Sequence, residues 1–228
     1  MGRFFHLFSA NLFGDRLMSD RTPVTIAILI ATVIVSAAIT LTASENWAAV
    51  VAGFMPVRWS VTVEIPADLW VIPAILTPLS AAVIHAGFIH LGFNMLMLWV
   101  CGTASENALG GRGVAILYLV GAYAAAAAQW AIEPMSEIPM IGASGAVSAV
   151  VGAYSLLYGR PRAKAIGPLS ARAVHVLWLA AAWTILNILI GILSAQAGMP
   201  IAAAAHIGGF VVGLALARPL LAWRWKDA

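Results

Sequence analysis

A serine and a histidine in separate apolar stretches are the residues of this chain best suited to catalysis. Ser144 lies in the run Gly142-Ala143-Ser144-Gly145, at the start of one apolar stretch, and His206 lies 62 residues later inside another. An imidazole bonded to a serine hydroxyl can act as its general base, and then as general acid to a leaving group. The two residue types and their placing predict a nucleophilic hydrolase.

The surroundings of Ser144 favour that chemistry. A serine at a helix N-terminus lies beside unpaired N–H groups and the positive end of the helix dipole, which stabilise an oxyanion. Gly142 and Gly145 are expected to let the backbone approach a substrate carbonyl closely. The alternative is that this Gly-Ala-Ser-Gly run only packs helices, since small residues are common at contacts between membrane helices.

Two further side chains, His90 and Asn94, are candidates to bind the oxyanion. They stand four residues apart, on one face of a helix, and both can donate hydrogen bonds. A zinc site would need three converging ligands, which His85, His90 and His206 could supply in principle. No carboxylate or thiolate accompanies them, so we expect no metal and no other cofactor. The single cysteine, Cys101, excludes an internal disulfide.

The elements that carry these residues are membrane spans. The 228-residue chain is 62% hydrophobic and 9% charged, with a mean hydropathy of +0.96, whereas soluble domains carry charges on about a quarter of their residues. We predict an all-α membrane protein with one six-span domain, 23–218, between tails at 1–22 and 219–228. Each expected span is long enough, or nearly long enough, to cross about 30 Å of hydrocarbon. The spans are 23–43, 82–101, 113–131, 144–159, 174–194 and 201–218.

The basic residues orient this topology. All but one of the 12, Arg58 being the exception, fall on one side of the membrane, which the positive-inside rule assigns to the cytoplasm together with both tails. They are Arg3, Arg16, Arg21, Arg112, Arg160, Arg162, Lys164, Arg172, Arg218, Arg224 and Lys226. The pI near 9.4 then reflects topology and contact with anionic lipid, and no nucleic-acid partner is expected.

In this orientation the candidate site residues share one depth near the external face. Spans two, four and six begin there, with His85 and His90 just inside the start of span two, and Ser144 and His206 within about two helical turns of the same level. Span four has only 15 residues from Ser144 to Tyr158, about 22 Å, so Ser144 is expected below the surface in a cavity that water reaches.

The first loop, 44–81, is expected to lie partly in the membrane. Its second half is apolar but interrupted by Pro73 and Pro78, and is too short to span. Three tryptophans in it suit the membrane–water interface: Trp47, Trp59 and Trp70.

Packing of spans four and six is expected to join the serine to the histidine. Each span carries small residues at four-residue spacing, which are Ser144, Ser148 and Gly152 in one and Gly209 and Gly213 in the other. Because spans four to six contain no Asp or Glu, we expect a Ser–His dyad whose imidazole is oriented by packing and neutral hydrogen bonds. Asn187 in span five is interpreted as an interhelical hydrogen-bonding residue.

Four motifs, in this order and spacing, resemble the rhomboid intramembrane serine proteases over about residues 70–217. They are His85-Ala-Gly-Phe-Ile-His90-Leu-Gly-Phe-Asn94, Gly102-Thr-Ala-Ser-Glu106, Gly142-Ala-Ser144-Gly145 and Ala205-His206-Ile-Gly-Gly209-Phe-Val-Val-Gly213. The resemblance implies a six-helix bundle of the compact bacterial type, in the plasma membrane, that cleaves transmembrane segments of substrate proteins. It makes Ser144 the nucleophile, His206 its base, and His90, Asn94 and the Ser144 N–H the oxyanion hole.

The resemblance also implies a lateral substrate gate, formed by span five and the loop before span six. Two positions depart from the family pattern. Leu76-Thr77 stand where many members have a Trp-Arg pair, and Ser148 stands where some have an aromatic residue stacked on the histidine. The main alternative is a catalytically inactive rhomboid-like protein that binds membrane clients; such relatives usually lack the serine or the histidine. A channel or transporter is disfavoured because no inverted repeat is visible.

Overall fold

The structure, a computed structural model, describes residues 22–159, 163–196 and 201–226. Nearly all of the predicted N-terminal tail lies outside these ranges, as do Arg160, Arg162 and the loop residues 197–200. The long helices are α2 (Pro23–Leu41), α6 (Phe88–Met97), α7 (Thr103–Ile132), α8 (Ser144–Tyr158), α9 (Ala171–Gln196) and α10 (Ala203–Arg224). Within the described ranges there are isolated bridges but no strands. The prediction of an all-α membrane protein is confirmed.

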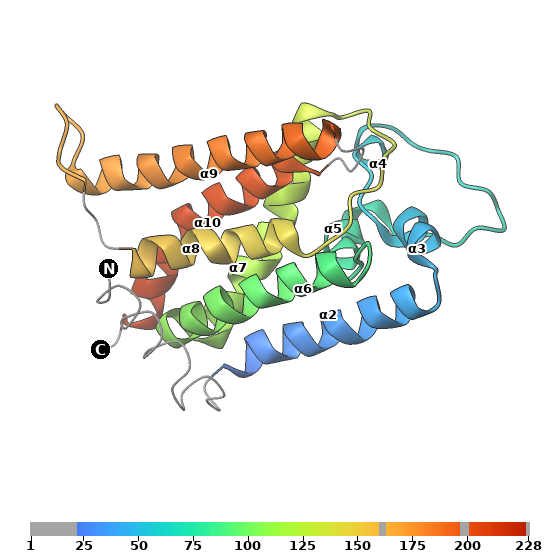
Figure 1. Cartoon of the computed structure of the whole chain (residues 1–228), viewed down its shortest axis with the longest axis horizontal. Helices are drawn as coiled ribbons and strands as arrows, with labels where there is room; N and C mark the ends of the chain where they lie inside the picture. The colour runs from blue at the N-terminus through green and yellow to red at the C-terminus, as the bar shows by residue number, and fades with distance from the viewer. Residues whose placement is uncertain (1–21, 160–162, 197–200, 227–228) are drawn as a thin grey trace.

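Four helical stretches of the described residues are long and apolar enough to cross a membrane. One of them, Phe88–Ile132, has 45 residues and would measure about 68 Å if straight. It is broken at Gly110, whose φ of 76° and ψ of 164° are not helical, and the chain turns back there (Figure 1). The break falls between the predicted spans two and three. The count of six spans stays a prediction.

The largest differences between the helices and the predicted spans lie at three places. The second span was expected from residue 82, but α6 starts at Phe88, after Gly87 with its φ of 90°. A π-helical turn, η2 (Leu98–Gly102), then joins α6 directly to α7. At the C-terminal end, α10 continues through Pro219 to Arg224, so residues 219–224 of the predicted tail prolong the last helix.

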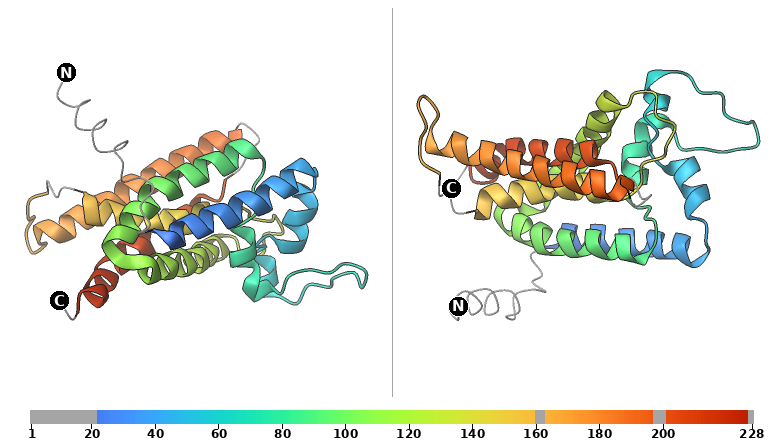
Figure 2. Two further views of the ribbon diagram at one scale, coloured as in Figure 1. Left: turned by 90° about the horizontal axis from the view of Figure 1, so that it is seen from below. Right: turned by 45° about the horizontal axis from the view of Figure 1, so that its top comes forward.

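The interior of the bundle is formed by α7, α8 and α10. Nine of the 15 residues of α8 are buried, and α8 lies between α9 and α6 in Figure 1 and in the right view of Figure 2. Helices α8 and α10 approach closely because glycine has no Cβ atom. A Cβ atom on Gly152 would overlap the carbonyl oxygen of Phe210, and one on Gly213 would overlap the carbonyl oxygen of Ala149. By contrast, α9 lies at the edge and buries only Asn187.

A buried carboxylate joins α2 to the start of α7. Glu106, 1% exposed, accepts hydrogen bonds from the N–H groups of Val24 (3.0 Å) and Thr25 (2.7 Å) and from the Thr25 hydroxyl (2.6 Å). These N–H groups lie in the first turn of α2, where backbone N–H groups have no carbonyl partner within the helix. Glu106 therefore caps α2 and stabilises the positive end of its dipole.

Replacing Glu106 with alanine is expected to lower the free energy of unfolding by about 2–3 kcal/mol, because it leaves buried donors unpaired. Glu106→Gln keeps one acceptor oxygen and should lose less. Unfolding in mixed detergent micelles, followed by circular dichroism, measures both variants. Wild-type stability for Glu106→Ala would contradict the capping role.

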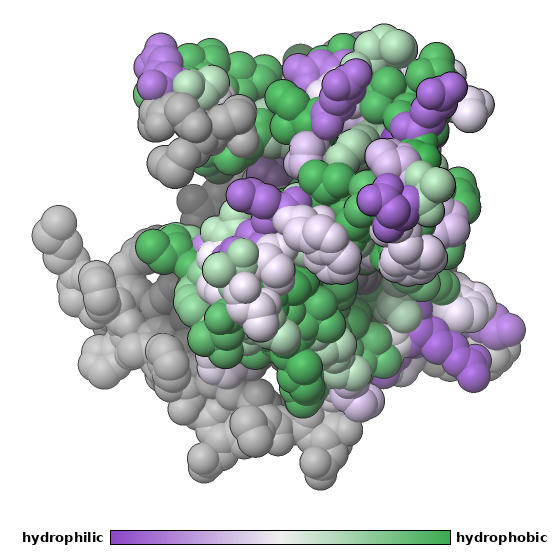
Figure 3. Space-filling model, turned by 90° about the vertical axis from the view of Figure 1, so that its right-hand side faces the viewer, coloured by the Kyte–Doolittle hydropathy of each residue, from purple (hydrophilic) through white to green (hydrophobic). Residues whose placement is uncertain are grey.

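The first loop folds into short helices at one end of the bundle (Figure 1). They are α3 (Glu45–Ala52), α4 (Val57–Ser60), the 3-10 turn η1 (Ala74–Leu76) and α5 (Thr77–Ala81). Figure 3 shows hydrophilic and hydrophobic side chains intermixed on this end. Trp47 and Trp70 are 62% and 73% exposed, as suits contact with lipid headgroups. Immersion of this loop in the membrane stays a prediction.

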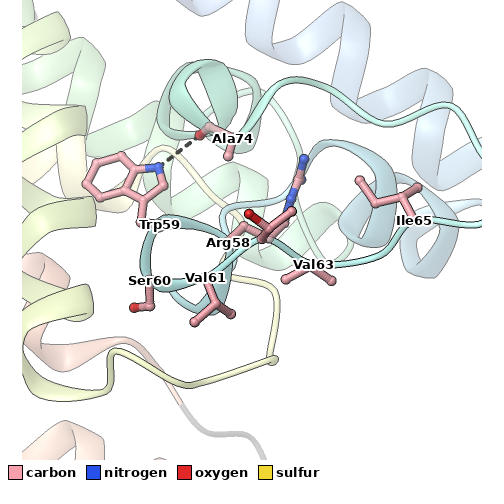
Figure 4. A pocket seen from close by; sticks show the side chains of 8 residues that line it. Arg58, Trp59, Ser60, Val61, Val63, Ile65 and Ala74 are labelled. Carbon is pink, nitrogen blue, oxygen red and sulfur yellow. Dashed lines mark hydrogen bonds between the residues drawn. The ribbon is translucent and has the colours of Figure 1, made fainter.

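Arg58 and Trp59 tie the two halves of the first loop together. The Trp59 indole N–H donates to the carbonyl of Ala74 at 3.0 Å (Figure 4), and Arg58 Nη2 donates to the carbonyl of Ile72 at 2.7 Å. A pocket of about 430 Å³ opens beside them, and no candidate site residue lines it. These two bonds hold the segment before α5 against α4.

Candidate active site

Ser144 and His206 lie within hydrogen-bond distance. Ser144 is the first residue of α8, and His206 lies in the first turn of α10. His206 Nε2 is 2.7 Å from Ser144 Oγ, and both side chains are half-buried. This is the geometry that a general base and its nucleophile require.

Glycines on α10 set the distance between these two helices. Cβ atoms on Gly209 and Gly213 would overlap the carbonyl oxygens of Gly145 and Ala149 on α8. The two rows of small residues therefore pack together as the sequence predicted. Gly145 differs from expectation in one respect: the space beside its Cα is filled by the side chain of Ala125 on α7. Its lack of a side chain serves helix packing.

The backbone before Ser144 is held by hydrogen bonds to the segment 81–85. Gly142 turns the chain with a φ of 116° and donates its N–H to the carbonyl of Ala81 at 2.9 Å. The N–H of Ala143 donates to His85 Nε2 at 3.2 Å. These bonds fix the approach of the chain to α8, and with it the position of the Ser144 hydroxyl.

His85 is a fully buried supporting residue. The Ser36 hydroxyl donates to the carbonyl of Val83 at 2.8 Å, so its oxygen accepts the proton of His85 Nδ1 at 2.9 Å. Both ring nitrogens of His85 are thereby used. The prediction placed His85 inside span two, which was wrong: it lies in the loop before α6, because α6 begins only after the turn at Gly87.

His90 and Asn94 lie one turn apart on α6, and the His90 ring faces the segment before Ser144. The His90 ring covers Gly142, where an added Cβ would lie 2.8 Å from Cε1 and 2.9 Å from Nε2. The N–H of Ala86 donates to His90 Nδ1 at 3.4 Å, which leaves the proton on Nε2. Asn94, which is buried, donates one amide N–H to the carbonyl of His90 at 3.0 Å. Each side chain thus has one N–H left for another acceptor.

Asn187 on α9 makes the interhelical hydrogen bond expected of it, and its partner is His206 of the candidate site. Its Oδ1 is 2.9 Å from His206 Nδ1, and the residue is 3% exposed. The Trp183 indole N–H also donates to the carbonyl of His206 at 3.2 Å. In the sequence, the sign of this role was the amide side chain of Asn187 in the middle of an apolar stretch. Ser148, by contrast, packs near Gly209.

The surroundings of the pair are otherwise apolar and tightly filled. A cavity of about 10 Å³ beside Ser144 is lined by alanines and glycines of α5, α7, α8 and α10 and of the residues next to α5 and α8, with Pro78 and Met140. This volume corresponds to about one water molecule. Among the described residues, no group of three or more His, Cys, Asp or Glu is placed to hold a metal ion.

This fold and this site define a helical membrane protein with a serine–histidine pair at the N-terminus of a buried helix. The chain belongs to the rhomboid family: the family's Rhomboid domain matches residues 74–223. It is similar to the protein named rhomboid protease GlpG of Serratia proteamaculans (strain 568), with 34% identity over 140 residues, or 60% of this chain and 45% of that protein.

Two other relatives show the extent of the similarity. The rhomboid protease GlpG of Pectobacterium atrosepticum is 34% identical over 140 residues, 60% of this chain and 46% of the relative. The rhomboid protease GluP of Bacillus subtilis (strain 168) is 39% identical over 84 residues, 37% of this chain and 15% of the relative. The chain thus matches less than half the length of these curated relatives.

Proposed function

We propose that this protein is an intramembrane serine endopeptidase that cleaves transmembrane segments of other membrane proteins. The observation that carries the proposal is the 2.7 Å contact between Ser144 Oγ and His206 Nε2 at the N-terminus of α8. The names of its relatives as rhomboid proteases support it. So do the apolar surroundings of the pair, which would meet a substrate segment inside the bilayer.

The mechanism begins with attack of Ser144 Oγ on the carbonyl carbon of the scissile peptide bond, while His206 Nε2 takes the hydroxyl proton. The resulting oxyanion accepts hydrogen bonds from the N–H of Ser144 and the side chains of His90 and Asn94. The imidazolium then gives its proton to the leaving amine, and an ester remains on Ser144. Water, deprotonated by His206, hydrolyses that ester and restores the serine.

The same proposal places the enzyme in a bacterial plasma membrane, with both tails in the cytoplasm and the active site open to the external side. The distribution of basic residues supports this orientation. Partners are then the lipid bilayer and transmembrane substrates that carry small residues before the cut and unwind easily.

Reconstitution into liposomes with a membrane-anchored reporter tests the proposal. Its transmembrane segment should contain small residues and a helix-breaking residue, and mass spectrometry of the fragments locates the cut. We expect a cut in or next to the membrane segment with the wild type and none with Ser144→Ala. Equal fragments from both proteins would contradict the proposal. An intact reporter that still binds the wild-type protein would favour the client-binding alternative.

Replacing Asn94 with alanine is expected to lower kcat about 10²-fold, the scale of losing one oxyanion donor. KM should change little, because the bond forms with the charge that develops in the transition state. Asn107→Ala, which alters an exposed asparagine of α7, is the matched control and should keep wild-type kcat. An unchanged kcat in Asn94→Ala would remove this residue from the mechanism.

A further inference from the structure

We propose that Asn187 is a positioning residue that completes a Ser144–His206–Asn187 triad. Its side-chain carbonyl holds the His206 imidazole in the tautomer whose Nε2 can accept the serine proton. The inference rests on the proposed function, because it assigns the group that orients the base of that reaction. Four observations carry it.

The first is the orientation of the amide. An asparagine amide has a donor end and an acceptor end. Asn187 Nδ2 lies 3.0 Å from the carbonyl oxygen of Trp183, one turn earlier on α9. A carbonyl oxygen only accepts hydrogen bonds, so the NH2 group must face it. The oxygen Oδ1 is therefore the end that faces His206 Nδ1, at 2.9 Å.

The second is the tautomer that this orientation requires. Because Oδ1 has no proton to give, the hydrogen in the bond must belong to His206 Nδ1. A neutral imidazole carries one N–H, so Nε2 is left with its lone pair. That lone pair lies 2.7 Å from Ser144 Oγ. The serine hydroxyl then donates to Nε2, which is the arrangement needed for proton removal.

The third is the composition of the helices around the imidazole. From Ser144 to Lys226 the sequence contains no aspartate or glutamate, so no carboxylate of α8, α9 or α10 can orient His206. An amide oxygen accepts the same Nδ1–H bond as a carboxylate, and it continues to accept it once the imidazole is protonated. It does so without burying a negative charge at membrane depth, which is costly.

The fourth is the packing of α9 against α10 next to His206. Asn187 is the only buried residue of this 26-residue helix; its neighbours Ile185 and Leu189 are 67% and 53% exposed. The Trp183 ring stacks on Phe210 of α10, with centroids 4.6 Å apart and planes at 9°, and its N–H binds the carbonyl of His206. The helix is thus held against α10 around the histidine, which keeps the amide within reach.

Kinetics of two Asn187 variants in the reconstituted enzyme test the role. Asn187→Leu keeps the approximate volume and removes the acceptor; Asn187→Asp keeps an acceptor oxygen. Loss of the correct tautomer costs a serine protease about 10⁴-fold in kcat when the partner is a carboxylate. For a neutral partner we expect a loss of about 10²-fold in Asn187→Leu, a KM within about twofold of wild type, and partial recovery of kcat in Asn187→Asp.

Gln196→Leu, at the exposed end of the same helix, is the matched control and should keep wild-type kcat. A purely structural tie between helices predicts a different result: Asn187→Leu would yield less folded protein or a lower Tm, but each folded molecule would turn over at the wild-type rate. That outcome would overturn the proposal.

Nitrogen-15 NMR of histidine-labelled protein provides a second readout that needs no substrate. We expect His206, identified by the signals lost in His206→Ala, to show a protonated Nδ1 and an unprotonated Nε2 in the wild type. In Asn187→Leu the His206 imidazole should become a mixture of the Nδ1–H and Nε2–H tautomers. An unchanged Nδ1–H signal in that variant would contradict the role of Asn187, whereas a wild type that cleaves no reporter contradicts the proposed function itself.

Discussion

Replacing Ser144 or His206 with alanine is expected to reduce cleavage of a transmembrane reporter to the same residual level, roughly 10⁴-fold or more below wild type. The 2.7 Å bond between them makes the hydroxyl and the imidazole one chemical unit, so either loss removes the activated nucleophile. The double variant should therefore be no slower than either single variant. Turnover numbers of the three proteins in liposomes measure this.

Ser148→Ala is the matched control for this prediction. Ser148 lies one turn further along α8, is 4% exposed and packs near Gly209 of α10. Its loss should leave kcat unchanged. If the double variant were much slower than each single variant, the serine and the histidine would be acting independently, and the paired mechanism would be wrong.

Replacing Gly213 with alanine is expected to destabilise the fold by about 3 kcal/mol, at the upper end of the cost of overfilling a packed core. The added methyl group would overlap the backbone carbonyl of Ala149, and a backbone atom cannot move aside as a flexible side chain can. Helices α8 and α10 would have to separate, which also lengthens the distance from Ser144 to His206. Unfolding in mixed micelles measures the stability.

Gly92→Ala is the matched control for Gly213→Ala. Gly92 also lies within a helix, α6, but an added Cβ there meets no atom within 4 Å. Alanine has the higher helix propensity by up to about 1 kcal/mol, so Gly92→Ala should be at least as stable as wild type. Equal stability of the two variants would show that the contact between α8 and α10 is not limited by Gly213.

The meeting of the serine and the histidine could be predicted from sequence because it depends on short, local patterns. Small residues four apart mark the contacting faces of α8 and α10, and two such faces can pack closely in only a few ways. The structure has Gly209 and Gly213 against the backbone of α8. The place of His85 was less predictable, since it depends on the single turn at Gly87 that delays the start of α6.

The contact of Asn187 with His206 could not be predicted, because the composition of α9 does not show which face of the helix is turned toward the bundle. A helix that faces lipid on most sides is apolar all round, and the sequence does not indicate which side meets the protein. Glu106 illustrates the converse problem. The polar segment between the runs 82–101 and 113–131 predicts a loop, and the chain does turn there, but only at Gly110, with helix on both sides of it. Glu106 in this segment binds the N-terminus of α2 instead of water, and its partners are more than 80 residues away in the chain.

Labelling of the detergent-purified protein with a fluorophosphonate probe shows whether His206 activates Ser144, since the probe reacts with activated serines and needs no knowledge of the substrate. We expect the wild type to be labelled at Ser144, and folded Ser144→Ala and His206→Ala proteins to stay unlabelled. Absence of labelling in folded wild-type protein, or equal labelling of His206→Ala, would contradict a nucleophile activated by this histidine.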